Sequence, residues 1–159
     1  FPAEPVAIDK DHDLAVIRVT GVKDLPAPLD LSAPPKPFPT MPVWVCGYPF
    51  GGRLAGGTGK NPAVSIGGGN VSALRTNAHG DLGTVQLNGA LNPGNSGGPV
   101  VAADGKLVGV AVRTIRNAGL GEAIPEADVT AMFRGRPAKP AVIPGPGKGG
   151  DATLKVLYI

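Results

Sequence analysis

A serine stands among glycines in the run Asn92-Pro93-Gly94-Asn95-Ser96-Gly97-Gly98-Pro99, which leads into an apolar segment. A packed interior gains little from such a run, because glycine has no side chain to bury and loses more backbone entropy on folding. A nucleophilic hydroxyl does gain from it. Gly94 can turn its N–H inward beside the N–H of Ser96, and two such donors can hold a developing oxyanion. The alternative is a glycine-rich hairpin loop with an incidental serine, since turns use these residue types freely.

Composition bounds the fold that must hold this loop. The chain has only 4% aromatic residues, so Val, Ala, Leu and Ile must build its core. Its 25 glycines and 18 prolines separate short β-branched runs, a combination typical of an all-β barrel or sandwich. No run approaches the roughly 18 consecutive apolar residues of a membrane span. The single cysteine, Cys46, excludes an internal disulfide, and we expect it to be a small buried hydrophobic residue in a strand.

Several classes of partner are excluded by the same inspection. The net charge of +3 is spread along the chain, with neither aromatic interleaving nor a recognition-helix pattern, so we predict no nucleic-acid partner. No cluster of Cys, His and carboxylates has metal-ligand spacing, so we predict no metal. Residues 56–60 (GGTGK) resemble a phosphate-binding loop, but Leu54 and Asn61 depart from its pattern. We therefore predict no cofactor.

Short apolar segments separated by turn residues predict a small antiparallel barrel. Asp104-Gly105 is a good hairpin signal between two of them. Residues 13–19 also alternate as a strand. Pro125 suits the first turn of a helix whose apolar stripe, Val129, Met132 and Phe133, can dock on the barrel. The six barrel strands are expected at residues 43–47, 63–75 (with a suggested kink at 67–69), 83–87, 98–101, 107–114 and 120–124.

Four motifs occur in order: residues 13–17 (DLAVI), 47–51 (GYPFG), 92–99 (NPGNSGGP) and 119–125 (GLGEAIP). Their order and spacing resemble the trypsin-fold serine proteases, and specifically the bacterial HtrA-type branch, over residues 4 to about 133. The resemblance implies an all-β fold of two six-stranded barrels, with an active site in the cleft between them. It also implies the order His, Asp, Ser along the chain.

This resemblance divides the chain into five expected parts. Residues 1–20 are the last strands of the N-terminal barrel, and residues 21–41 are a Pro-rich linker between barrels. Residues 42–134 form the complete C-terminal six-stranded barrel with one short terminal helix. Residues 135–150 are a Pro/Gly linker. Residues 151–159 begin a further domain or form a tail, with pairing to the barrel edge as the alternative.

The resemblance implies a role for individual residues. Ser96 is the nucleophile, and the N–H groups of Gly94 and Ser96 form the oxyanion hole. Asp13 is the carboxylate that orients the catalytic imidazole. From the residues alone, a solvated turn aspartate explains Asp13 equally well. Ala90 is the floor of the pocket for the residue before the cut, and a small neutral residue there argues against a preference for Lys or Arg.

The catalytic histidine is missing from this pattern. His12 is the immediate neighbour of Asp13, and adjacent strand residues point to opposite faces, so His12 is no base for Ser96. His79 lies in a polar turn. Since the chain starts at Phe1 without Met, we expect a fragment whose parent supplies the histidine and further domains. We therefore expect no useful activity from this chain alone.

The first hypothesis is a serine endopeptidase that acts on polypeptides through an acyl-enzyme at Ser96. The second is a non-catalytic trypsin-fold module that binds extended peptides. In both, the strand at Ala111, Val112 and Arg113 would pair with extended substrate. Asn95 implies that activation by a newly cut N-terminus is not used. The resemblance suggests a periplasmic or secreted bacterial protein.

Overall fold

The computed structural model describes residues 1–50, 63–89, 91–115, 118–134, 141–144 and 152–155. The chain divides into two compact units. One comprises Phe1–Asp24 with Thr130–Ile159, and the other comprises Leu25–Val129. Each is described on its own. The predicted fold class is confirmed: the described chain is mostly β, with one closed six-stranded antiparallel barrel, one short helix and small additional sheets.

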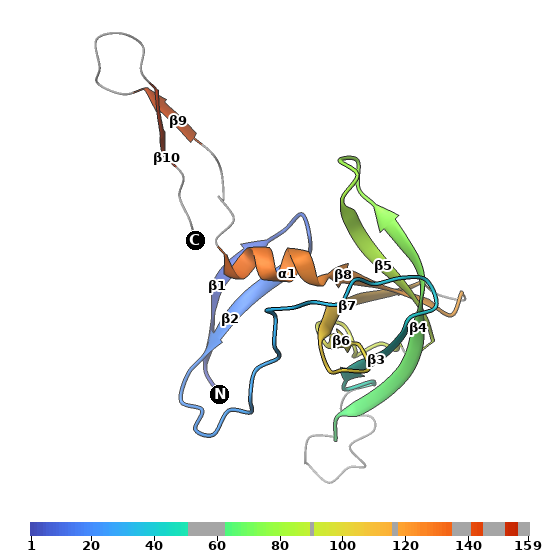
Figure 1. The fold of residues 1–159 in the computed structure, drawn as a ribbon. Helices are drawn as coiled ribbons and strands as arrows, with labels where there is room; N and C mark the ends of the chain where they lie inside the picture. Colours follow the sequence, from blue (N-terminus) through green and yellow to red (C-terminus); the bar gives the residue numbers. More distant parts are fainter. Residues whose placement is uncertain (51–62, 90, 116–117, 135–140, 145–151, 156–159) are drawn as a thin grey trace. The chain divides into compact units, whose positions relative to one another are not determined.

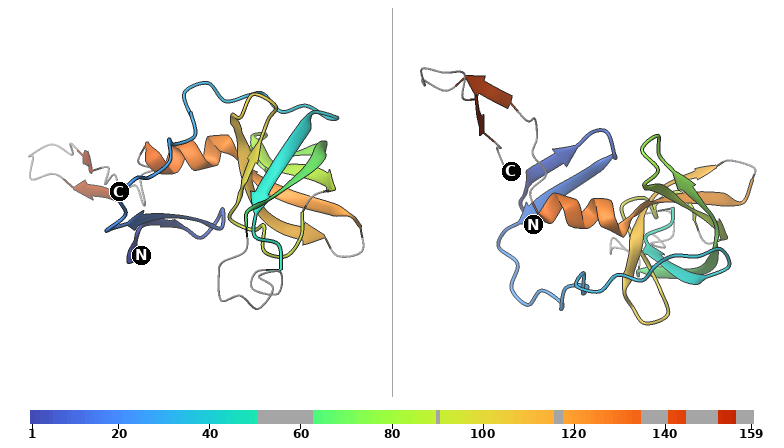
Figure 2. Two further views of the ribbon diagram at one scale, coloured as in Figure 1. Left: turned by 90° about the horizontal axis from the view of Figure 1, so that it is seen from below. Right: turned by 45° about the horizontal axis from the view of Figure 1, so that its top comes forward.

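The Leu25–Val129 unit is built around the closed barrel, in which the strands follow the order β3-β4-β5-β8-β7-β6 and β6 returns to pair with β3 (Figures 1 and 2). All six neighbouring pairs are antiparallel. The six predicted strands are therefore present, with ends moved by only one or two residues. They are β3 (Pro42–Gly47), β4 (Ser65–Thr76), β5 (Leu82–Gly89), β6 (Pro99–Val101), β7 (Leu107–Ile115) and β8 (Leu120–Pro125).

Alternation along β3 shows how the barrel is filled. Val43 and Val45 are almost fully buried, while Trp44 and Cys46 on the opposite face are half-buried. Cys46 is therefore a free, partly exposed thiol rather than the fully buried residue expected. Successive side chains of a strand point to opposite faces, so Cys46 points away from the core that holds Val43 and Val45. The core consists mainly of valine, leucine and alanine: Met41, Val43, Val45, Val71, Val85, Leu87, Leu91, Val100, Ala102, Val108, Ala111 and Ala123.

The suggested kink at residues 67–69 is absent. Val43, Trp44 and Val45 pair with these three glycines in unbroken register. The irregularities of β4 lie later, between Val71 and Ala73 and between Arg75 and Thr76, where it pairs with β5. Glycine lets a strand bend but does not require it to, and here pairing with β3 holds all three glycines in register.

The predicted helix is present as α1 (Glu126–Phe133), directly after Pro125 at the end of β8. Glu126 and Asp128 lie in its first turn, where carboxylates are favoured by the helix dipole. The apolar stripe is only partly covered. Val129 and Met132 are half-buried, and Phe133 is 63% exposed.

The Phe1–Asp24 segment folds as a hairpin of β1 (Ala3–Asp9) and β2 (Leu14–Val19). The strand expected from Asp13 begins one residue later, because Asp13 has a φ of +53°. The last residue pair between β1 and β2, next to the turn, is Asp9 with Leu14.

A second antiparallel pair joins β9 (Ala141–Pro144) and β10 (Ala152–Lys155). The last strand thus pairs with β9, in the segment expected to be a linker, and not with the barrel edge. The glycine and proline content of residues 135–150 hid this strand, because only four residues pair. No helix in the described part of the chain is long and apolar enough to cross a membrane.

Candidate active site

Ser96 lies exposed at the tip of a tight turn that precedes β6. The N–H of Asn95 donates to the carbonyl of Asn92 at 3.0 Å, and the N–H of Gly98 donates to the carbonyl of Asn95 at 2.9 Å. These two bonds bend the chain back on itself on either side of Ser96. The Ser96 hydroxyl donates to the carbonyl oxygen of Val112 in β7 at 2.6 Å. Its oxygen is thereby held at the surface, beside the backbone of a barrel strand.

Gly94 has a φ of +102°, a conformation that glycine adopts at little cost. A Cβ at this position would overlap the carbonyl oxygen of Tyr48. The contact is close because the segment after β3 lies against the turn. Tyr48 N–H donates to the Gly94 carbonyl at 3.3 Å, and Phe50 N–H donates to the Pro93 carbonyl at 2.9 Å. Only glycine therefore fits at position 94.

The two predicted oxyanion donors can be examined directly. Within the described residues, neither the N–H of Gly94 nor that of Ser96 donates to a protein acceptor. Both residues are exposed. Because both residues are exposed, water can satisfy these two donors, which lie two positions apart in the chain. They are available to an incoming oxygen.

The other two glycines of the loop join it to β7. Gly97, with a φ of +85°, donates its N–H to Ala111 O at 2.7 Å, and Ala111 N–H donates to Gly98 O at 2.9 Å. A Cβ at Gly98 would overlap the carbonyl oxygen of Cys46. Gly98 thus lies between β3 and β7, and its missing side chain lets both strands approach.

Sequence reasoning overlooked the packing of Asn95. Its side chain is 4% exposed and lies against Gly47, where an added Cβ would come within 2.6 Å of Asn95 Oδ1. Two of the four sequence motifs therefore meet at this point. The only signal in the sequence was a polar residue within a glycine-rich turn, which does not distinguish a buried amide from an exposed one.

The predicted substrate strand, β7, extends beyond β6 beside Ser96. β6 reaches only to the pair Pro99 and Val110, and β8 pairs with Ala111 and Arg113 across a bulge at Val112. Arg113 is bonded to Glu122 of β8, and the hydrogen bond and charge of Glu122 raise the pKa of Arg113. The guanidinium therefore stays charged and lies mostly in solvent.

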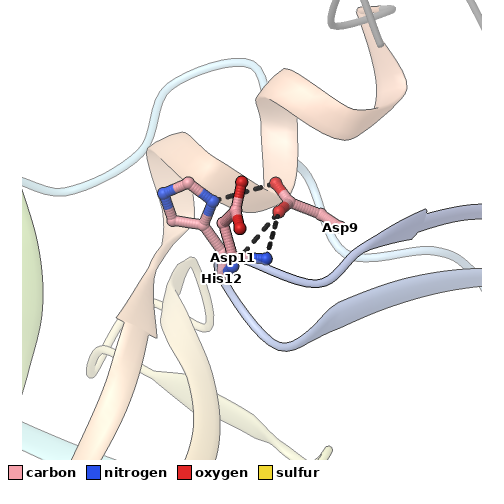
Figure 3. Close-up of polar contacts among 3 residues, drawn as sticks. All are labelled: Asp9, Asp11 and His12. Carbon is pink, nitrogen blue, oxygen red and sulfur yellow. Dashed lines mark hydrogen bonds and ion pairs between the residues drawn. The ribbon is translucent and has the colours of Figure 1, made fainter.

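The remaining predicted residues lie elsewhere. Ala90 is outside the described residues. Asp13 belongs to the Phe1–Asp24 segment, whereas Ser96 belongs to the other unit. Asp13 is exposed, and its carboxylate has no bonded partner within the described chain. His12 Nδ1 is bonded to Asp9 Oδ2 at 2.9 Å (Figure 3), and His79 is exposed in the turn between β4 and β5. The described residues hold no cluster of three or more metal-ligating side chains.

The sequence model of the trypsin-like peptidase domain family matches residues 1–110. These residues include the hairpin, most of the barrel and the Ser96 loop. The chain belongs to this family. Among its curated relatives, a putative Do-like protease of Arabidopsis thaliana is 35% identical over 119 residues, covering 72% of this chain and 22% of the relative. The serine protease PepD of Mycobacterium tuberculosis is also 35% identical, over 141 residues, covering 78% and 29%.

The Do-like protease HtrA of Lactococcus lactis subsp. lactis is 29% identical over 156 residues, covering 88% of this chain and 37% of the relative. The crystal structure of a serine endoprotease from Yersinia pestis is similar with a TM-score of 0.61 and 26% identity, over 83% of this chain and 43% of that one. The resemblance to HtrA-type proteases is thus confirmed for this trypsin-like domain. The chain spans between 22% and 43% of the length of these four proteins.

Proposed function

We propose that the protein containing this chain is a serine endopeptidase, with Ser96 as its nucleophile. The observation that carries the proposal is the exposed Ser96 hydroxyl in a turn where the N–H groups of Gly94 and Ser96 both lack an acceptor within the described chain. A nucleophile next to two backbone donors is the arrangement that acyl transfer requires. The similarity to serine proteases of the HtrA type supports it.

In the proposed reaction, Ser96 Oγ attacks the carbonyl carbon of the scissile peptide bond and gives its proton to an imidazole. The carbonyl oxygen becomes an oxyanion held by Gly94 and Ser96 N–H. The C–N bond then breaks, the leaving amine takes the proton from the imidazolium, and water later hydrolyses the ester. Asp13 holds the imidazole in the correct orientation and stabilises its charged form. Before attack, Ser96 must exchange its bond to Val112 O for one to the base.

We propose that the base is a histidine outside these 159 residues. The chain has two histidines. His12 Nδ1 is bonded to Asp9 and not to Asp13. His79 lies in an exposed turn, and its backbone N–H donates to Asn77 Oδ1 at 2.9 Å. In the sequence, His12 is the immediate neighbour of Asp13 and His79 follows it, so neither fits a family order in which the histidine lies well upstream of the aspartate. This chain alone is therefore expected to lack useful peptidase activity.

Extended polypeptide is the proposed substrate. Beyond Val110, β7 has no β6 partner, and on that side Gly97, Gly98 and the Ser96 hydroxyl are the described groups that bond its backbone. Ala111, which the sequence placed in the same substrate strand, already bonds Gly97 and Gly98 through its backbone, so a peptide can add to this edge at Val112 and Arg113 as a further strand. The reacting carbonyl would then lie next to Ser96. Ala90 remains the proposed pocket floor, with a preference for small or medium apolar residues.

A second function is favoured by one specific observation, the bond between the His12 ring and Asp9 in place of one to Asp13. In this alternative, the domain binds extended peptides at the β7 edge without cleaving them. It keeps the strand-addition surface and leaves Ser96 bonded to Val112 O.

Fluorophosphonate labelling separates the two functions. The chain alone and its parent polypeptide are labelled side by side, with Ser96→Ala in each as the control. We expect the parent to label at Ser96, the chain alone to label at least about a hundredfold more slowly, and Ser96→Ala not to label. A folded parent that binds extended peptide but never labels would establish the binding module instead.

A further inference from the structure

The turn between β1 and β2 is organised by one side chain, that of Asp9. Its Oδ1 accepts hydrogen bonds from the N–H groups of Asp11 and His12, both at 3.1 Å. Its Oδ2 lies 2.9 Å from His12 Nδ1, so the ring of His12 is also tied to it (Figure 3). The Asp9 side chain is 15% exposed and that of His12 is 35% exposed. These bonds are therefore partly shielded from water.

The turn ends in a residue held in an uncommon conformation. Asp13 has a φ of +53°, in the left-handed region that side chains with a Cβ adopt infrequently. Such a conformation persists where the residues on both sides determine it. On one side, His12 is fixed to Asp9 through its N–H and its ring. On the other side, Leu14 is buried and pairs with Asp9 across the hairpin.

Both constraints on Asp13 thus come from the same residue. The backbone of Asp9 pairs with Leu14 at the end of the β1–β2 hairpin next to the turn, and the Asp9 carboxylate bonds His12. The direction of the Asp13 Cα–Cβ bond follows from this backbone conformation. In contrast, the Asp13 carboxylate has no bonded partner among the described residues that could hold it independently.

We propose that Asp9 is a positioning residue for the Asp13 carboxylate. It acts through His12 and the backbone of the turn, and it does not contact the substrate. This inference rests on the proposed function, in which Asp13 orients the catalytic imidazole. It adds a residue that the sequence motifs did not include, since the DLAVI motif begins only at Asp13.

The conformational part of the inference is tested on the chain itself. The three-bond coupling between the amide and α protons of Asp13 reports its φ, and ¹⁵N spectra of His12 report which ring nitrogen carries the proton. Asp9→Ala should move both signals towards those of a mobile turn. Asp11→Asn is the matched control, because it removes a carboxylate from the same turn and within the described chain breaks no side-chain bond. Unchanged signals in Asp9→Ala would overturn the inference.

The functional part is tested by a double-mutant cycle in the parent polypeptide, with kcat expressed per fluorophosphonate-titrated site. We expect Asp9→Ala to lower kcat about tenfold with little change in KM. Asp9→Asn should lower kcat less than Asp9→Ala does, because its side chain keeps one acceptor oxygen. Asp11→Asn should change kcat less than about twofold. In an Asp13→Asn background, Asp9→Ala should have no further effect, because a positioning residue acts only through the group it positions.

The outcomes distinguish the two levels of the proposal. If Asp13→Asn lowers kcat strongly and Asp9→Ala does not, the inference is wrong and the proposed function stands. If Asp9→Ala is equally damaging with and without Asp13, its role is general stability and the positioning role is overturned. If Asp13→Asn leaves kcat unchanged, the proposed role of Asp13 fails, and the inference fails with it.

Discussion

The Ser96 loop and the Asp13 turn are held in different ways. The loop is fixed by backbone hydrogen bonds to β7 and to the segment after β3, and by glycines whose missing side chains make room for neighbouring carbonyls. The turn depends on the carboxylate of Asp9 and closes a two-stranded hairpin. Backbone bonds in a closed barrel survive most side-chain changes. A turn held by one carboxylate does not, so a single mutation can change the conformation of the Asp13 turn more easily than that of the Ser96 loop.

The largest expected effect concerns the glycines. Gly94→Ala should destabilise the barrel by about 3 kcal/mol, because the new Cβ meets the carbonyl of Tyr48 and the backbone is left-handed. Gly105→Ala is the matched control. Its φ is +79°, but a Cβ there would have no neighbour, so only the strain of about 1 kcal/mol applies. Urea unfolding followed by the fluorescence of Trp44, the single tryptophan, measures both.

Equal losses in these two variants would show that the Ser96 loop is not sterically locked. The contrast with the Asp13 turn would then disappear.

A smaller effect should separate the core of the barrel from the open face of the hairpin. Val85 is fully buried, and Val85→Ala should cost about 2 kcal/mol of barrel stability. Ile17 is 59% exposed, and Ile17→Ala should change the stability of the barrel by less than about 0.5 kcal/mol. The same Trp44 signal serves for both. A large shift caused by Ile17→Ala would mean that the hairpin face is covered in solution.

The smallest effect concerns a second carboxylate-held turn. Asp30 Oδ1 accepts the N–H of Ser32 at 2.8 Å, and hydrogen bonds from the Ser32 side chain and backbone lower the pKa of Asp30. A lowered folded pKa stabilises the fold above the unfolded pKa, and this is lost as pH falls through the folded value. Ser32→Ala should raise the pKa of Asp30 towards its ordinary value. A ¹³C NMR titration of the carboxylate measures it, and an unchanged titration would contradict the assigned cause.

The sequence predicted the barrel well because its signals are local. Alternation along residues 43–47, the Asp104-Gly105 turn and the helix after Pro125 each depend on a few neighbouring residues. Two expectations were wrong, the kink at residues 67–69 and the buried Cys46, because strand pairing and the face on which a residue lies decide them. The pairing of β9 with β10 was not predicted, since β9 lies in a segment rich in proline and glycine.

The site shows the same division. The glycine-rich sequence predicted a tight turn around Ser96, and the structure has one, because the residue types of one short loop determine it. The contribution of Asp9 was not predicted. It requires knowing that its carboxylate turns back onto His12, and a run of aspartates in a turn does not show which one is solvated.

The contact between Gly47 and Asn95 has a consequence for how this domain can vary among organisms. A side chain at position 47 would meet not only the amide of Asn95 but also its Cα at 2.9 Å, so shortening residue 95 does not make enough room. A mutation at Gly47 therefore has no simple compensating partner. Natural variants that retain the Ser96 loop should retain this distant glycine as well, and the two motifs should be inherited together.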